Sequence, residues 1–120
     1  MYSAAATLAA LRGIDARWRR PLQPGVAAEL EAFTLESVAI PHDAAAPLAF
    51  VITARSTGAR LGVAHDLGAV PRDFHAQFAR CDALCLEANH DVAMLRDGPY
   101  PPSLKARIRG GRGHLNNDEA

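Results

Sequence analysis

Residues 86–117 read LEANHDVAMLRDGPYPPSLKARIRGGRGHLNN, and this stretch says most about the fold. An apolar run ends at Glu87, which predicts a β-strand followed at once by a carboxylate. A short helical turn comes next, and a proline-rich break at 98–102 separates it from a second helix over 103–108. His114 follows in a glycine-flanked loop. This order of elements is typical of an α/β protein that carries polar side chains beyond its strands.

The chain before this stretch also alternates between strand-like and helix-like segments. Alternating or continuous apolar runs indicate strands, and apolar residues about one turn apart indicate helices. We expect strands at residues 32–40, 47–54, 59–66 and 82–87, helices at 4–13, 70–81 and 103–108, and a polar loop at 15–25. The side chains expected to be buried are Val38, Ile40, Phe50, Ile52, Leu61, Val63, Leu84 and Leu86, with Phe74 and Phe78 packing on one side of the sheet.

The composition is that of an ordinary single domain. The 120 residues are 49% hydrophobic and 22% charged, and the formal net charge is zero. Neutral charge gives no global electrostatic argument for binding nucleic acid or a membrane. Cys81 and Cys85 would lie too far apart in a strand for a disulfide, so we expect buried free thiols in a reducing cytoplasm. No segment is long enough to span a membrane, and the start lacks the basic region of a signal peptide.

Four polar residues occupy positions at which a sheet can build a site. His42, Asp66 and Glu87 each follow a strand-like run, and His114 lies in the glycine-flanked loop. If the strands share one sheet, all four side chains converge at one edge. Imidazole and carboxylate groups are the usual ligands of zinc and other divalent metals, and a metal so held acidifies a water. The alternative interpretation is that each residue is an ordinary turn or capping residue.

The order of these motifs resembles the metallo-β-lactamase-fold hydrolases. The matching pattern runs from Thr34 through HDA, LGVAHDLG and LEANHD to GHLNN. It is most similar to the exonuclease-like branch related to the tRNA 3′-processing endonuclease. The resemblance implies an α/β fold: part of the αββα sandwich, mainly one mixed β-sheet with flanking helices. It also implies that His42 ligates a metal, that Asp66 bridges two metals, and that Glu87 and His114 support proton transfer near the leaving group.

The chain also departs from the family's pattern. The His-x-His-x-Asp-His motif and the last histidine ligand are absent, and Asn116 stands where the family loop has serine. The resemblance therefore implies a single partial domain over residues 1–120, the central to C-terminal portion of a metallo-β-lactamase domain. The intact family holds two divalent metal ions, zinc or manganese. We expect this chain to bind them weakly or not at all, because two ligands are fewer than zinc requires.

The expected function is that of a fragment of a metal-dependent hydrolase. It would be a phosphodiesterase or nuclease using a two-metal-activated water, acting on nucleic acid in the intact family, with the isolated chain inactive. The alternative is a non-catalytic remnant or interaction module, and an unrelated α/β domain is a third interpretation. An exposed apolar sheet face, with self-association through it, is expected of a cut domain. His65 is expected to be structural or to support the site. Asp43, Asn89, His90 and Asp91 are candidates for hydrogen bonds that support the site or order its loops, and His75 is expected to be exposed.

Overall fold

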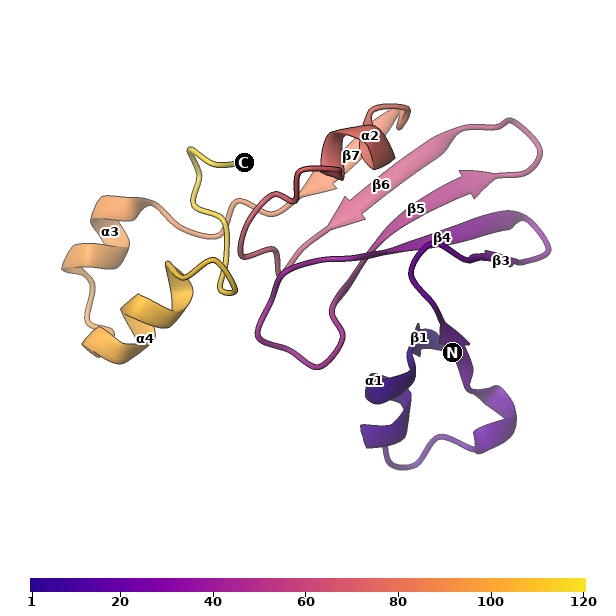
Figure 1. The fold of residues 1–120 in the computed structure, drawn as a ribbon, viewed down its shortest axis with the longest axis horizontal. Coiled ribbons are helices and arrows are strands. Elements are labelled where there is room, and N and C mark those ends of the chain that lie inside the picture. Colours follow the sequence, from indigo (N-terminus) through magenta and orange to yellow (C-terminus); the bar gives the residue numbers. More distant parts are fainter.

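The structure is a computed structural model that describes all 120 residues, and one five-stranded sheet is its main element (Figure 1). The strand order is β3-β4-β5-β6-β7, with antiparallel neighbours except for the parallel pair β6–β7. The strands span Ala27–Glu29 (β3), Phe33–Ala39 (β4), Leu48–Ala54 (β5), Arg60–Ala64 (β6) and Ala83–Leu86 (β7). The mixed sheet and its four expected strands are therefore confirmed, and β3 is an additional strand.

The connections bring the ends of three strands to one edge of the sheet. A tight turn joins β5 to β6, and Gly58 in it has a φ of +76°, which side chains with a Cβ rarely adopt. The parallel strands β6 and β7 need a crossover, which contains the helix α2 (Phe74–Phe78). Because β4 is antiparallel to β5 and β5 to β6, the strands β4, β6 and β7 all run the same way. The residues that follow these three strands therefore emerge at the same edge.

One face of the sheet is covered by α2. The rings of Phe74 and Phe78 stack with centroids 4.3 Å apart, and both side chains are buried. A Cβ at Gly62 would lie only 2.7 Å from Phe78, so the glycine lets this ring approach the sheet. The buried cluster around them comprises Ile40, Ala49, Val51, Ala64, Leu67, Phe74, Phe78 and Leu115. The predicted packing of both phenylalanines on one side is confirmed.

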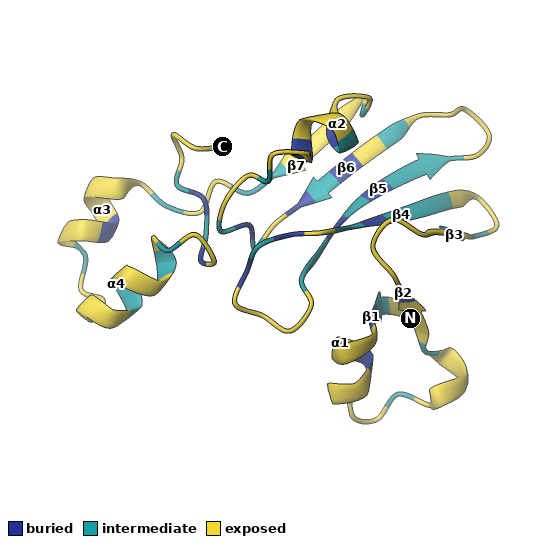
Figure 2. Cartoon of the chain, in the orientation of Figure 1, coloured by how far each residue is buried: buried dark blue, intermediate teal, exposed yellow.

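The opposite face of the sheet is apolar and only partly covered. This face, called the apolar face below, carries Phe33, Leu35, Phe50, Ile52, Leu61 and Val63, all intermediate or exposed (Figure 2). The prediction that the core strands are mostly buried holds only for Ile40: Val38, Phe50, Ile52, Val63 and Leu86 are intermediate, and Leu61 and Leu84 are 36% and 43% exposed. Leu61 lies on the apolar face, which no helix covers, whereas Leu84 lies on the α2 face beside Gly62, on the edge strand β7. The surface area is 7817 Å², against about 6,300 Å² for a compact protein of this mass.

The N-terminal residues form a small unit of their own. A parallel pair, β1 (Tyr2–Ala4) and β2 (Arg20–Leu22), flanks the helix α1 (Ala5–Ala10) and the 3₁₀ turn η1 (Ala16–Trp18). The guanidinium of Arg19 donates to the carbonyls of residues 8, 11 and 14, which have no partner within the helix. The expected helix over 4–13 is therefore too long, and the expected loop at 15–25 contains a strand, because a short parallel pairing orders both ends of this unit.

Two helices project beyond the sheet on the side where β7 ends (Figure 1). They are α3 (Val92–Asp97) and α4 (Pro102–Ile108), and the Asp91 side chain caps α3 by accepting from the Met94 N–H. The helix expected at 103–108 is confirmed. The helix expected over 70–81 is only the five residues of α2, because residues before Phe74 form a turn on the carbonyl of Pro71. Every helix is too short to cross a lipid bilayer.

Candidate metal centre

His42 lies just beyond β4, and the loop before His114 fixes its imidazole. The His42 Nδ1 is 2.8 Å from the carbonyl oxygen of Gly113, so Nδ1 carries the proton and Nε2 keeps its lone pair. A Cβ at Gly113 would lie 2.2 Å from the carbonyl oxygens of Arg107 and Ile108, so only glycine fits at this close approach. The His42 side chain is 10% exposed, and its ring is held with Nε2 as the nitrogen available to a ligand.

Asp66 follows β6 in a conformation that the end of β7 supports. Its φ is +56°, in the left-handed region that aspartate tolerates better than most residues. Its backbone N–H donates to the Glu87 Oε2 at 2.7 Å, and the next N–H, of Leu67, donates to Oε1 at 3.2 Å. The Asp66 side chain remains 50% exposed, with its Oδ2 3.2 Å from the His65 Nδ1. The Asp66 carboxylate is thus held at the surface by a turn whose backbone N–H groups are bound by Glu87.

Glu87 is an almost buried carboxylate that accepts four hydrogen bonds. Its side chain is 7% exposed, and it accepts from the backbone N–H groups of Asp66, Leu67 and Leu115 and from the His114 Nδ1 at 3.0 Å. Burial raises the pKa of Glu87, but the hydrogen bonds from His114 and from the backbone outweigh it, so the pKa lies below its ordinary value. Since an ionised carboxylate only accepts, Nδ1 of His114 carries the proton and Nε2 is available to a ligand.

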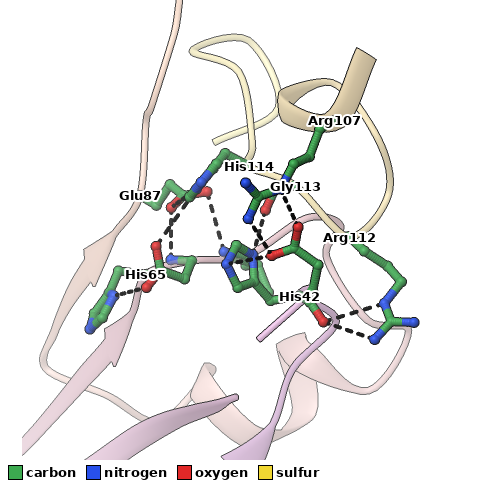
Figure 3. A network of polar contacts seen from close by, with 10 residues as sticks. His42, His65, Glu87, Arg107, Arg112, Gly113 and His114 are labelled. Atoms are coloured by element: carbon green, nitrogen blue, oxygen red, sulfur yellow. Dashed lines mark hydrogen bonds and ion pairs between the residues drawn. The ribbon is translucent and has the colours of Figure 1, made fainter. Parts of the chain in front are cut away.

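The rings of His42 and His114 lie beside each other, with centroids 5.0 Å apart, and Figure 3 shows them together with Glu87. His42, Asp66 and His114 each offer one ligand atom, and these atoms lie within 4.8 Å of one another. Tetrahedral zinc, at 2.0–2.2 Å from its donors, places ligand atoms roughly 3.4 Å apart, so the three ligand atoms would have to approach one another by up to about 1.4 Å to bind it. Two imidazoles and a carboxylate form a catalytic type of zinc ligand set. The carboxylate on His114 and the carbonyl on His42 are the usual supports of metal-bound histidines. The residues present therefore fit a divalent metal.

Asp43 and two arginines border this cluster. Arg107 forms a two-point ion pair with Asp43, and these hydrogen bonds hold the pKa of the Asp43 carboxyl below its usual value. The Asp43 Oδ1 also lies 3.4 Å from the His42 Nε2. Arg112 donates twice to the carbonyl oxygen of His42, at 3.2 and 3.3 Å. These contacts tie the loop after β4 to α4 and to the turn that follows it.

The structure brings together all four residues that the strand ends singled out. The sequence did not indicate that His114 points a nitrogen at His42 and Asp66, nor that Gly113, Arg107 and Arg112 hold the His42 loop. The glycine immediately before His114 was the available signal, since such a residue marks close backbone contact. Among the expected supporting residues, Asp43 and His65 contact the cluster, Asp91 caps α3, and His75 is exposed on α2 as expected.

Two curated proteins are similar in sequence to this chain. Exodeoxyribonuclease YycJ of Bacillus anthracis is 36% identical over 86 residues, which is 72% of this chain and 32% of that protein. Exodeoxyribonuclease WalJ of Streptococcus pneumoniae is 35% identical over 85 residues, 71% of this chain and 31% of that protein. The chain thus spans about a third of the length of these curated relatives. No family model matches the chain.

Among solved structures, Zn²⁺-bound PqqB from Methylobacterium extorquens matches with a TM-score of 0.70 and 20% sequence identity. The match covers 99% of this chain and 47% of that protein, whose fold is that of the metallo-β-lactamases. The chain has part of the metallo-β-lactamase fold. That part includes the five-stranded sheet and the strand ends that carry His42, Asp66 and Glu87. The fold expected from the sequence resemblance is therefore confirmed.

Proposed function

We propose that this chain supplies part of a metal-dependent centre that hydrolyses DNA phosphodiesters. The observation that carries the proposal is the convergence of two histidines, each with Nδ1 already donating, on the Asp66 carboxylate. The names of the relatives, both exodeoxyribonucleases, support DNA as the substrate class, and the zinc in the PqqB structure supports a metal. Hydrolysis adds one water across a P–O bond and releases an alcohol and a phosphate monoester.

In this proposal His42 and His114 bind a zinc or manganese ion through Nε2, and Asp66 binds it through one carboxylate oxygen. A metal held by these residues would acidify a water and polarise a phosphoryl oxygen. Asp66 is half exposed, and its second carboxylate oxygen would remain available to a further cation in an intact domain. Glu87 holds the Nδ1 proton of His114 and so keeps Nε2 directed at the ion. Three donors leave the open position that a catalytic metal requires.

This proposal makes His114 a metal ligand, whereas the family resemblance implies that His114 transfers protons. A ligand and a proton-transfer residue differ in a measurable way. If His114 is a ligand, His114→Ala weakens metal binding, whereas a residue that only transfers protons leaves metal binding unchanged. The His114 Nδ1 lies 3.0 Å from the Glu87 Oε2 and 3.7 Å from the Asp66 Oδ1. The hydrogen bond to Glu87 supports the ligand role because it leaves Nε2 as the nitrogen without a proton.

The test is calorimetry of zinc and manganese with the chain alone. We expect one ion per chain, with binding lost in Asp66→Asn and strongly weakened in His42→Ala and His114→Ala. His75→Ala is the matched control, because His75 is exposed on α2 and should bind like the wild type. No binding by the wild type, or equal binding by all variants, would contradict the proposal. Hydrolysis is then tested by adding the N-terminal half of a relative, since the chain spans only a third of each one.

The apolar face favours a second candidate function, an association module. The surface exceeds that of a compact protein of the same mass by about 1,500 Å². A standard interface buries about 800 Å² on each partner. The apolar face supplies large side chains for such an interface, since none of Phe33, Leu35, Phe50, Ile52, Leu61 and Val63 is buried. We propose a second copy of this chain as the occupant, because the face is apolar and offers no charge of one sign to select another partner. Its test is the oligomeric state in solution.

A further inference from the structure

A cavity of about 420 Å³ opens beside the metal-binding cluster, between the end of the sheet and the helices α3 and α4. His42 and His114 are among its lining residues, so the cavity adjoins the cluster. Leu95, Leu104 and Ile108 supply apolar walls from the two helices. The volume lies within the range of small-ligand sites, and the mixture of apolar walls with a few polar groups is typical of them.

Two lining residues of the cavity have no structural explanation. The Nδ1 of His90 is buried and has no hydrogen-bond partner, although buried polar atoms almost always have one. Tyr100, in the loop between α3 and α4, leaves half of its large side chain exposed (52%) while lining the cavity. A ligand with a flat apolar surface and hydrogen-bonding edges would satisfy both residues. A nucleobase has both properties.

The charge of this part of the chain points to the same ligand. Residues 92–115 hold five basic residues and one aspartate, a net charge of +4 in a chain whose total is zero. Arg96 is neutralised by Asp97 and Arg107 by Asp43. The other three are not: Lys105 donates only to the carbonyl of Arg96, Arg112 only to that of His42, and Arg109 has no side-chain hydrogen bond or ion pair. The helices beside the cavity therefore carry local positive charge suited to phosphates.

We infer that this cavity holds the base of the nucleotide next to the cleaved phosphodiester of single-stranded DNA. Tyr100 stacks on the base, the His90 Nδ1 hydrogen-bonds to its edge, and Lys105 and Arg109 contact the backbone phosphates. The phosphodiester then lies at the part of the cavity that His42 and His114 line. A walled cavity admits a base only when the base is unstacked and unpaired, which favours single-stranded over duplex DNA. This inference rests on the proposed function, because it takes the cluster as the place of hydrolysis.

The test is fluorescence anisotropy with a labelled oligothymidylate in EDTA, so that binding does not depend on a metal. Loss of a stacked aromatic side chain costs roughly 5- to 150-fold in affinity. We expect a loss in this range for Tyr100→Ala and none for Tyr2→Ala, the chain's other tyrosine, which lies in the N-terminal unit. An oligonucleotide with an abasic terminal nucleotide should bind the wild type as weakly as the intact one binds Tyr100→Ala. The Tyr100→Ala variant should bind the abasic and the intact oligonucleotide with the same affinity.

A second pair of variants tests how much positive charge contributes to DNA binding. Arg109→Gln should weaken binding and flatten its dependence on salt, whereas Arg80→Gln, an exposed arginine just after α2, should do neither. Equal effects in either matched pair, tighter binding of duplex than of single strands, or no DNA binding would overturn the inference. Zinc calorimetry on the same variants separates it from the proposed function. Normal zinc binding with no DNA binding overturns only the base site, and absent zinc binding overturns the proposed metal centre.

Discussion

Replacing Glu87 with glutamine tests whether this residue organises the cluster. Each carboxylate oxygen accepts two hydrogen bonds: Oε1 from Leu67 and Leu115, and Oε2 from Asp66 and His114. An amide nitrogen in place of Oε2 faces the Asp66 N–H and leaves it without an acceptor, which costs about 1–3 kcal/mol. Loss of the charge on the remaining acceptor adds about 1 kcal/mol. We therefore expect Glu87→Gln to lower the free energy of unfolding by about 2–4 kcal/mol.

The same substitution also reverses the tautomer of His114. The new amide donates toward Nδ1, so the proton moves to Nε2 and removes the lone pair that would bind a metal. Thermal unfolding followed by circular dichroism should show a fall in Tm of roughly 10 °C or more, and zinc calorimetry should show weaker binding. The control is Glu36→Gln, which removes only a half-exposed pair with Arg60, worth about 0–1 kcal/mol. Equal changes in Tm for the two variants, with unaltered zinc affinity, would refute this account of Glu87.

Two further predictions concern the two faces of the sheet. Gly62→Ala should destabilise the chain by about 1–3 kcal/mol in urea unfolding, because the new methyl group meets the Phe78 ring at 2.7 Å. Gly111→Ala, where a Cβ meets nothing within 4 Å, should leave the unfolding midpoint unchanged, and equal effects would show that α2 does not pack as described. Leu61→Asp should convert a dimer to a monomer in sedimentation velocity, since Leu61 lies on the apolar face. A wild type that is monomeric at all concentrations would contradict self-association.

The sequence predicted the long strands of the sheet well because each has a clear apolar pattern. Alternation over residues 32–40 found β4 to within one residue at each end, and the apolar run at 47–54 found β5. The pair β1–β2 escaped, because three-residue strands leave no periodic pattern and their pairing depends on tertiary contacts. The expected burial of Leu61 failed for a related reason. Hydrophobicity identifies a side chain suited to a core, but not whether another layer covers that face.

Some features of the site could be predicted from the sequence, and others depend on contacts that only the fold creates. That His42, Asp66 and Glu87 share an edge follows from strand order and direction, which the sequence allowed us to guess. The position of His114 depends on the approach of Gly113 to the end of α4, a contact between residues close in sequence that no motif spacing reveals. The available nitrogen of each histidine depends on its hydrogen-bond partner, and those partners are 71 and 27 residues away.

The ion pair between Asp43 and Arg107 explains why the cluster has three donors instead of four. Asp43 Oδ1 is 3.4 Å from the His42 Nε2, close enough to join the ligand set after a small rotation. Both of its oxygens are already held by the guanidinium of Arg107, on α4, and that geometry resists rotation toward a metal. A fourth protein ligand would close the coordination sphere as in structural zinc sites, whereas three leave a position for water or substrate. Arg107 also lines the cavity, so in the proposed metal centre one side chain would both keep a coordination position open and form a wall of the space beside it.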